Sequence, residues 1–591
     1  MCPPARRACT TAVAIDRLTW AETSRSFNRL YTDMSFVLFV SGRSLSSLRG
    51  WLAGNEVLHE LVMLLLLILH PLSVQSACLG VDECQCEPGQ VINCRNSDLT
   101  AVPTFDLTGS PTNYSELTLA GNRITSIPRL AFRGLQFRRL DLTDNPLESL
   151  NSSAFSGLER ELHELKLTLS RNAEFPVAAI RPLTRLRILH VSGFRGRQLP
   201  SGALSTLSEL VELRLTAGSL GTLNADDLVA QRGSLQTLAL HGNDLSAVPT
   251  ALLSTATMLT TLDLSRNQIS SLPADVFAGL VNLDVVDLSN NGLGGGGIDV
   301  AAFRTTQNVD GRLRTLTMKS CRLSDRDMEA LSQLHTVADL ILSYNSIANL
   351  PANLFNRMRS LRQLRLDNNR LQTITRSTFS SASTTLEVLD LAHNPLSSVP
   401  EDAFLDLNYL QELRLDGVTT IQLTAKSFSP QHRRVLRTLS VRGSGIGARL
   451  WPLVSNLERL NGLFAAESSI SSIPDFAFRR NSALQTIDLS SNSISSLTQR
   501  SVYGLSGSLT AINLHGNRIS TIHQCTFHHF RSVSLSTHVL CFSNNIPDFI
   551  QHFSLLPPPG DIVTTRVCFV YFGRKIWHFV TALSIAFARI Y

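Results

Sequence analysis

The sequence predicts an α/β repeat solenoid, in which short coils stack so that their strands form one parallel sheet. The first observation behind this prediction is a recurring pattern, L-x-x-L-x-L-x-x-N, whose neighbouring asparagines lie 23 to 25 residues apart. The second is composition, because hydrophobic residues make up 43% of the 591 residues and aromatic residues only 6%, which is typical of a leucine-packed core. The asparagines are Asn122, Asn145, Asn243, Asn267, Asn291, Asn345, Asn369, Asn394, Asn492 and Asn517.

The register continues where asparagine is replaced, which gives about 17 repeats between residues 114 and 530. A chain of this length would normally suggest several globular domains. The unbroken period overrides that expectation, since each repeat contacts only its neighbours and one solenoid can grow long. The period therefore predicts a leucine-rich-repeat horseshoe with a parallel concave sheet and an irregular or 3-10 convex side. The replacing residues are Ser170, Phe194, Gly218, Cys321, Val418, Ser444 and Ser468.

Each repeat position has a structural role. In residues 262–264 (Leu-Asp-Leu), alternation with period two points the leucines inward and the aspartate outward. The asparagine amide carries donors and an acceptor, so stacked turns can satisfy buried backbone groups through a ladder of side-chain bonds. We expect Phe194, Gly218 and Val418 to interrupt this ladder. Phenylalanines such as Phe277 and Phe355 recur on the convex side, and we interpret that column as core packing.

One repeat is longer than the others. The step from Asn291 to Cys321 spans 30 residues and contains the four consecutive glycines 294–297. Because glycine tolerates backbone angles that other residues avoid, we expect this insertion to bulge from the solenoid as a flexible loop.

Four cysteines precede the first repeat in the pattern C-x5-C-x-C-x7-C. No histidine lies among them and C-x-C is poor zinc-finger spacing, so a zinc site is disfavoured. A disulfide-linked cap over residues 78–113 meets a physical need, because the first repeat would otherwise expose its apolar edge. The sequence alone allows three connectivities among Cys78, Cys84, Cys86 and Cys94.

This motif, together with the repeats, resembles the extracellular leucine-rich-repeat proteins, a group that contains chaoptin, Slit and Toll-like receptor ectodomains. The resemblance covers residues 78–530, and it implies pairing of Cys78 with Cys86 and of Cys84 with Cys94. It also implies extracellular recognition in an adhesion, receptor or matrix context. Such relatives usually end in a second cysteine-rich cap. Residues 531–591 show no recognisable cap of this kind, and we expect an atypical C-terminal tail there.

The region before the cap resembles an export signal. Residues 57–77 contain an apolar run at 61–69 and small residues just before Cys78, and disulfides require the oxidising compartment that export provides. The run is too short for a transmembrane helix. We expect the extra segment 1–56 to be disordered or to precede the true start. A further apolar stretch at 576–591 leaves membrane anchoring open, and Asn113 and Asn151 are candidate glycosylation sites.

Outward positions of successive strands form columns of side chains about 4.8 Å apart. One column lies four residues before each asparagine position, and a second lies two residues later. Together they predict a charged docking surface for a protein partner at Arg365, Asp367, Asp390, Arg414, Asp416 and Arg442. The alternative is a solvated face whose alternating charges neutralise one another. A weaker candidate surface, for an acidic glycan, consists of Lys166, His190 and Arg214.

Other function classes find little support. The net charge of +6 is modest and no basic cluster indicates nucleic acid. No catalytic, cofactor or metal motif occurs in a suitable context, so we predict no enzyme, no cofactor and no small-molecule substrate. A cytosolic inhibitor-type repeat protein would use longer, helix-bearing repeats. The sequence therefore predicts a secreted or cell-surface protein that binds a protein, or a glycan, without catalysis. The alternative is the ectodomain of a membrane-anchored Toll-like receptor, truncated before its anchor.

Overall fold

The computed structural model describes residues 77–87, 90–107, 113–304, 312–352, 354–382, 384–505, 507–522, 526, 539–542 and 566–569. The chain divides into two units, Met1–Cys78 and Leu79–Tyr591, and the architecture below is that of the second unit. Residues 1–56 and 57–76 lie outside the described residues, as does the tail 531–591 apart from two short strands. The expectations for those segments stay predictions.

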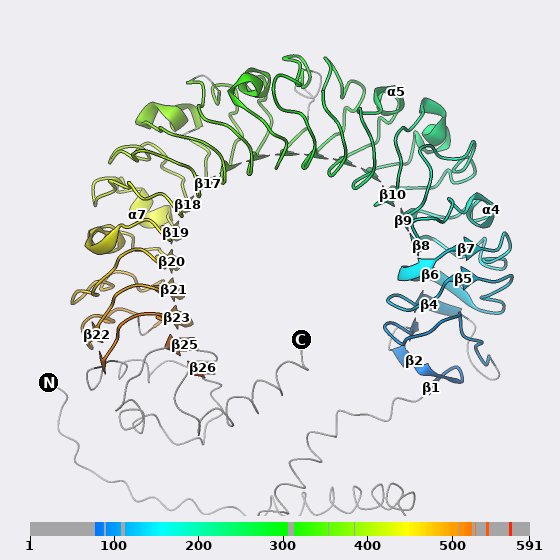
Figure 1. Cartoon of the computed structure of the whole chain (residues 1–591), viewed down its shortest axis with the longest axis horizontal. Helices are drawn as coiled ribbons and strands as arrows, with labels where there is room; N and C mark the ends of the chain where they lie inside the picture. The colour runs from blue at the N-terminus through cyan, green and yellow to red at the C-terminus, as the bar shows by residue number, and fades with distance from the viewer. Residues whose placement is uncertain are drawn as a thin grey trace, which may run out of the picture. The chain divides into compact units, whose positions relative to one another are not determined.

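The second unit is a stack of about 17 turns, each of which adds one strand to a parallel sheet. The strands line the inner edge of the arc, and the helices and loops lie outside it (Figure 1). The predicted leucine-rich-repeat solenoid is confirmed. The first strands of the parallel run are β3 (Val91–Asn93), β4 (Asn113–Thr118), β6 (Gln136–Leu147), β8 (Glu164–Leu169), β9 (Ile188–Ser192), β10 (Glu212–Thr216), β11 (Thr237–Ala239), β12 (Thr261–Asp263) and β13 (Val285–Asp287). The run continues with β14 (Thr315–Thr317), β15 (Asp339–Ile341), β16 (Gln363–Arg365), β17 (Val388–Asp390), β18 (Glu412–Arg414), β19 (Thr438–Ser440), β20 (Gly462–Phe464), β21 (Thr486–Asp488) and β23 (Ala511–Asn513).

Neighbouring strands pair in register, so equivalent repeat positions lie side by side. Leu238 pairs with Leu262 and Leu262 with Val286, and all three side chains are buried. The parallel sheet also continues beyond residue 530, where the sequence placed the last repeat. There β25 (Val539–Phe542) pairs with β23 and β26 (Arg566–Phe569) pairs with β25.

The convex side consists of loops, short strands and short helices, as predicted. Phenylalanines pack beneath them: ring centroids are 6.0 Å apart for Phe132 and Phe155 and 5.8 Å apart for Phe277 and Phe303, and all four rings are buried. The phenylalanine column is therefore core. The helices are α4 (Val177–Ile180), η1 (Ala225–Gln231), α5 (Thr250–Leu253), η3 (Asp325–Asp327), α6 (Met328–Leu331), η4 (Arg376–Ala382), α7 (His432–Val435), η5 (Gly447–Arg449) and α8 (Leu450–Val454), and the short strands are β5 (Ser126–Ile127), β7 (Ser149–Leu150), β22 (Ser496–Leu497) and β24 (Thr521–Ile522).

The asparagines form the expected ladder of side-chain bonds. In a representative turn, the Asn267 Nδ2 donates to the carbonyl of Leu264 in its own turn (2.9 Å) and of Leu240 in the preceding turn (3.0 Å). Its Oδ1 accepts from the backbone N–H of Leu245 at 3.1 Å. Each asparagine thereby satisfies buried backbone groups of two turns, which explains why the residue recurs.

Two of the replacing residues preserve part of the ladder. The Cys321 thiol donates to the Leu288 carbonyl at 3.1 Å, and the Ser468 hydroxyl donates to the Val441 carbonyl at 2.7 Å. Burial raises the pKa of Cys321 to about 12, so this thiol stays protonated. Phe194 supplies no such bond, yet β8–β9 and β9–β10 each pair at five positions, against three for β12–β13. The longer pairing belongs to the early turns and not to the interruption as such, since β4–β6 also pairs at five positions whereas β10–β11, beside Gly218, pairs at three.

A left-handed residue precedes each asparagine of the ladder, which the sequence did not reveal. Gly242 adopts φ +71°, as glycine readily does, but Arg266, Tyr344 and His393 adopt φ of +54°, +58° and +54°. This conformation is unfavourable for residues with a Cβ. It recurs because the chain must turn sharply there to bring the next side chain into the ladder.

The run of four glycines does not bulge as predicted. A Cβ on Gly294 would lie 1.7 Å from the Arg322 carbonyl oxygen, and one on Gly297 would lie 2.4 Å from the Ser270 carbonyl oxygen, so the two ends of the run pack closely against neighbouring turns. A Cβ on Gly295 or Gly296 would meet open space, but the backbone N–H of Gly296 donates to the buried carboxylate of Asp327 at 2.9 Å. Glycine therefore allows close approach at the two ends and a positive φ at the two middle positions. Residues 305–311 of the same insertion lie outside the described part of the chain.

The cysteine-rich segment forms the first layer of the stack. Its strand β2 (Val81–Glu87) pairs antiparallel with β3, and Cys84 is joined to Cys94 by a disulfide with 4.2 Å between the Cα atoms. Cys78, in β1 (Ala77–Cys78), and Cys86 are also disulfide-bonded. The Asn122 Nδ2 donates to the Cys94 carbonyl at 2.8 Å, so the ladder begins on the cap itself.

Candidate binding surface

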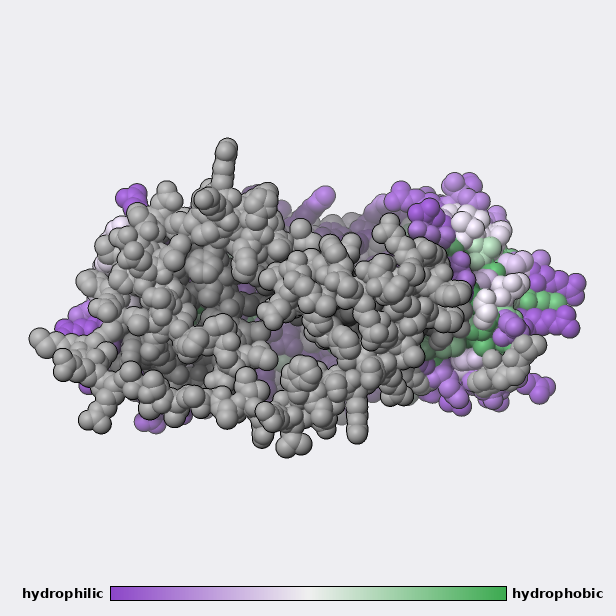
Figure 2. Space-filling view, turned by 90° about the horizontal axis from the view of Figure 1, so that it is seen from below, coloured by the Kyte–Doolittle hydropathy of each residue, from purple (hydrophilic) through white to green (hydrophobic). Residues whose placement is uncertain are grey.

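The concave face carries the predicted columns. Arg365, Asp390 and Arg414 occupy equivalent positions on β16, β17 and β18, and each is the register partner of the next. The columns run the length of the sheet, so the face is an extended surface and not an enclosed pocket. Figure 2 views the chain from below, and the described residues visible at its two sides are mostly hydrophilic, with a hydrophobic area among them on the right.

The three residues do not pair with one another across the strands. The Arg414 Nε lies 2.5 Å from Glu412 Oε1 in its own strand, and Arg365 Nη2 lies 3.0 Å from the amide oxygen of Gln363 when that amide is oriented to accept. Glu412 and Gln363 form a third outward column, six residues before the ladder position. The alternation of the strands could have revealed this column in the sequence.

Asp390 is the least expected member of the surface. Asp390 is only 5% exposed, and its Oδ1 accepts a hydrogen bond from the Ala392 N–H at 3.1 Å. None of the described basic side chains lies within ion-pair distance of its carboxylate. Burial raises the pKa of Asp390 to about 6, an effect that Asp367 adds to and that Arg414 and Arg365 oppose. The carboxylate is therefore ionised at neutral pH but close to its titration range.

Two other acidic residues of the surface are held by neighbouring turns. The Asp416 Oδ1 accepts from the Ser440 hydroxyl at 2.6 Å and from the Arg442 N–H at 2.8 Å. Asp367 accepts from the Ser343 hydroxyl and from the Asn368 amide. Both carboxylates remain partly accessible on the concave side.

Arg442 closes the surface at its C-terminal end. Its guanidinium lies 4.9 Å from the centre of the Phe464 ring and reaches Asp488, two strands further on, at 3.0 Å. The Arg442 side chain is half-exposed, and an arginine that lies over an aromatic ring is a common feature of protein interfaces. Phe464 and Asp488 both lie in the first column; Phe464 was missed in the sequence because it is uncharged, and Asp488 because it lies beyond the charged group that ends at Arg442.

The weaker candidate surface is neutralised from within. The Lys166 Nζ lies 2.6 Å from Glu164, and both His190 Nε2 and Arg214 Nε lie within 2.8 Å of Glu212 Oε1. Burial lowers the pKa of His190, although Glu212 opposes this, so the imidazole is mostly neutral at pH 7. The three bases therefore offer little net positive charge to an acidic glycan.

The predicted glycosylation sites, Asn113 and Asn151, both lie exposed on the second unit. Their modification stays a prediction, as does the pairing of Cys78 with Cys86. Among the described residues, no helix combines the length and apolar character that a membrane span requires.

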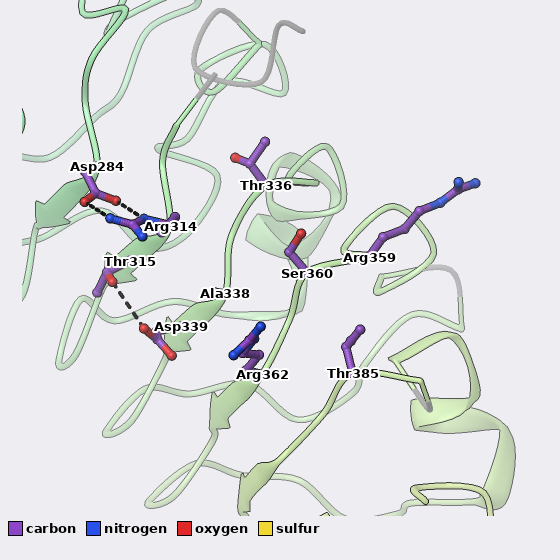
Figure 3. A pocket seen from close by; sticks show the side chains of 10 residues that line it. All are labelled: Asp284, Arg314, Thr315, Thr336, Ala338, Asp339, Arg359, Ser360, Arg362 and Thr385. Carbon is purple, nitrogen blue, oxygen red and sulfur yellow. Dashed lines mark hydrogen bonds and ion pairs between the residues drawn. The ribbon is translucent and has the colours of Figure 1, made fainter. Parts of the chain in front are cut away.

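One concave feature was not predicted at all. Side chains that immediately precede the strands β13 to β16 enclose a groove of about 610 Å³, with Arg314 and Asp284 bonded at its wall (Figure 3). The lining residues Asp284, Arg314 and Arg362 share one repeat position, seven residues before the ladder position, so the period could have grouped them. They were missed because only the outward positions of the strands were considered.

Comparison with known proteins agrees with this geometry. Residues 233–293, 311–371, 359–418 and 458–519 match the family model described as leucine rich repeat. The chain therefore contains leucine-rich repeats, in agreement with its fold. These matches cover the middle and late turns, including the surface around Arg365 and Arg414. They indicate no catalytic family.

Curated relatives match in part. The chain is 36% identical to Podocan-like protein 1 of Homo sapiens over 167 residues, which is 27% of this chain and 31% of that protein. It is 32% identical to Tsukushi of Gallus gallus over 142 residues, 24% of this chain and 31% of Tsukushi. The matched part is thus less than a third of either relative.

A solved structure covers more of the chain. The Toll chain in the structure of the Drosophila Toll–Spatzle complex superposes with a TM-score of 0.56 at 20% identity, over 78% of this chain and 65% of that one. At this identity the likeness shows the fold alone. It places the present chain among curved leucine-rich-repeat solenoids.

Proposed function

We propose that this protein is an extracellular, non-catalytic recognition protein that binds a protein partner along its concave face. The observation that carries the proposal is the surface between Arg365 and Phe464, where half-exposed charged side chains and an arginine-covered ring stand on consecutive strands. Rigid strands hold these groups in fixed columns, which favours recognition of one shape and charge pattern.

The extracellular part of the proposal rests on the disulfides. A bonded Cys84–Cys94 pair, with Cys78 and Cys86 also bonded, is typical of proteins that fold in an oxidising compartment. The names of relatives support a protein partner: one is Transforming growth factor beta activator LRRC33 of Danio rerio, 28% identical over 134 residues. Anchoring to a membrane, as in a receptor ectodomain, is compatible with the same binding face.

The test begins with expression of the full chain in secretory cells and a search of an array of purified secreted and cell-surface proteins. The triple variant Arg365→Ala, Arg414→Ala, Arg442→Ala should weaken binding of the recovered partner by about tenfold or more, since charge pairs at an interface centre contribute over 1.4 kcal/mol. The matched control replaces three exposed arginines outside the concave strands, Arg129, Arg133 and Arg480. Equal binding by the patch variant and the wild type would rule the proposal out, as would retention of the protein inside the cell.

A further inference from the structure

A second candidate binding surface lies at the edge where the strands begin. The groove of about 610 Å³ is lined by residues that directly precede or open the strands β13 to β16, including Asp284, Arg314, Asp339 and Arg362 (Figure 3). An adjoining hollow of about 500 Å³ shares Asp284, Arg314 and Thr336 with it. We call the two together the strand-start groove. It runs from Thr260 in the turn of Asn267 to Thr385 in the turn of Asn394.

The length of the groove suits an extended polypeptide. Six consecutive turns contribute to it, and five steps of about 4.8 Å give roughly 24 Å. An extended chain rises about 3.3 Å per residue, so about seven residues would fill the groove. Both hollows are open along one side, so a segment could lie in them without threading.

The groove is positively charged, and part of that charge is not used internally. Its lining includes four arginines and two aspartates. Arg314 is committed to Asp284 by two bonds of 2.7 and 2.5 Å, and these bonds hold the pKa of Asp284 below its ordinary value. The Arg362 guanidinium lies only loosely against Glu387, at 3.8 Å.

The remaining two arginines, Arg312 and Arg359, are exposed, and neither lies within 4.0 Å of a carboxylate among the described residues. In Figure 3, Arg359 extends away from the neighbouring lining residues towards open space. Thr315, Thr336, Ser360 and Thr385 also line the groove. The hydroxyls of Thr315 and Thr336 already bond to Asp339 and to the Leu313 carbonyl, so the arginines are the main donors. Two free guanidinium groups and a loosely held third would suit carboxylates.

Apolar side chains flank the charged centre. Met258 and Val281 are 40% and 59% exposed, and they stand two residues and one residue before the lining residues Thr260 and Asn282. At the other end Tyr409 is 54% exposed and occupies the position equivalent to Thr385 in the next turn. Exposed methionine, tyrosine and arginine together are typical of protein interfaces and less useful for a sulfated glycan.

We propose that the strand-start groove binds an extended acidic segment of a protein, independently of the concave surface. Carboxylates of the segment would contact Arg312, Arg359 and Arg362, and apolar residues at its ends would pack on Met258 and Val281 and on Tyr409. The segment belongs to a partner and not to the described part of this chain.

Selection from a random peptide library tests the proposal without knowledge of the partner. Peptides of about seven residues or more are selected on the immobilised full chain and counter-selected on the double variant Arg359→Ala, Arg362→Ala. The expected result is an acidic consensus with apolar residues near its ends. A synthetic consensus peptide should lose about tenfold or more in affinity for the double variant and should bind more weakly at high salt. Met258→Ser with Tyr409→Ser should weaken it to a smaller extent.

Controls separate this proposal from the proposed function. The concave variant Arg365→Ala, Arg414→Ala, Arg442→Ala and the outer-loop variant Arg129→Ala, Arg133→Ala should bind the consensus peptide within about twofold of the wild type. Failure to enrich any acidic peptide, or equal binding to the Arg359/Arg362 variant, overturns the groove proposal and leaves the concave surface untouched. A heparin oligosaccharide that binds in the groove where the peptide does not would overturn it in favour of a glycan.

Discussion

Two stretches of the same concave sheet use the same columns differently. In the early stretch, Lys166, His190 and Arg214 each contact a glutamate of the column beside them, so their charge is consumed locally. In the late stretch, Asp390 is buried without an ion pair and Arg442 lies over the ring of Phe464. The presence of charged side chains in a column therefore does not by itself indicate a binding surface. Arg414 and Arg442 also pair, with Glu412 and Asp488, so what distinguishes the late stretch is the unpaired buried carboxylate of Asp390 and the aromatic surface of Phe464.

The two stretches also differ beneath the surface. The early stretch has Ser170, Phe194 and Gly218 at its ladder positions, whereas Asn369 and Asn394 lie beneath the centre of the late one. Backbone pairing is longer in the early stretch, with five residue pairs between β9 and β10 against three between β16 and β17. In the centre of the late stretch, Asn369 and Asn394 add side-chain bonds between the turns.

The largest expected effect comes from removing one of those asparagines. In Asn369→Ala, the carbonyls of Leu342 and Leu366 and the N–H of Ile347 lose their partners, which lie 2.9, 3.0 and 3.2 Å away. Buried unpaired groups are costly, so the free energy of unfolding should fall by about 2–4 kcal/mol. Urea denaturation measures this, and the amide of Ile347 should exchange faster with solvent.

The matched control is Ser170→Ala, at the same repeat position in the early stretch. Ser170 contributes a backbone bond to Leu147 at 2.8 Å, which the substitution retains. The free energy of unfolding should change by about 0.5 kcal/mol or less. Comparable losses in the two variants would show that the ladder does not set the two stretches apart.

An intermediate effect is expected from Asp390→Asn, and it depends on pH. The folded pKa of about 6 is above the unfolded value of about 3.9, so the folded state holds its proton to higher pH. Ionisation therefore costs wild-type stability as pH rises from about 4 to about 6, and this loss persists above that range. The variant should be more stable than the wild type by about 2 kcal/mol near pH 7.5 and equal to it near pH 4. Urea denaturation at the two pH values checks this.

Asp263, in the same column, provides a control of opposite sign. Burial raises its pKa, but hydrogen bonds from His241 and Ser265 outweigh burial, so its folded pKa is lowered. Such a group contributes stability above the unfolded pKa and loses it as pH falls through the folded value. Asp263→Asn should therefore destabilise the protein at neutral pH. Stabilisation by both substitutions would contradict the distinction drawn for Asp390.

The smallest effect is expected in the early stretch. Glu212→Gln removes the charge that holds His190 and Arg214, at a cost of about 0.2–1 kcal/mol, as is usual for partly exposed ion pairs. Since Glu212 raises the pKa of His190 against the lowering effect of burial, the substitution should lower that pKa further. An NMR titration of the imidazole follows this directly. An unchanged or higher His190 pKa would mean that the glutamate does not neutralise the early stretch.

The sequence predicted the architecture well because the repeat imposes it. The period located the strands, the ladder and the phenylalanine core, and equivalent positions such as Arg365, Asp390 and Arg414 proved to be neighbours. Features that depend on side-chain conformation could not be predicted from the repeat. Side-chain pairing depends on rotamers, so Arg414 bonds within its strand, and Gly294 and Gly297 pack closely against neighbouring turns. Several residues of the strand-start groove share one repeat position, but the hollow between them depends on side-chain packing that the period does not specify.

The most direct test of the account is hydroxyl-radical footprinting of the full chain with and without the protein partner recovered from the array. Phe464 is the natural reporter, since its half-exposed ring lies beside Arg442 in the late stretch. If the partner binds the concave face, it should reduce oxidation of Phe464 and leave unchanged the oxidation of His190 in the early stretch and of Phe476, which is 44% exposed on an outer loop. Unchanged oxidation of Phe464, or protection of Phe476 instead, would contradict recognition on the concave face.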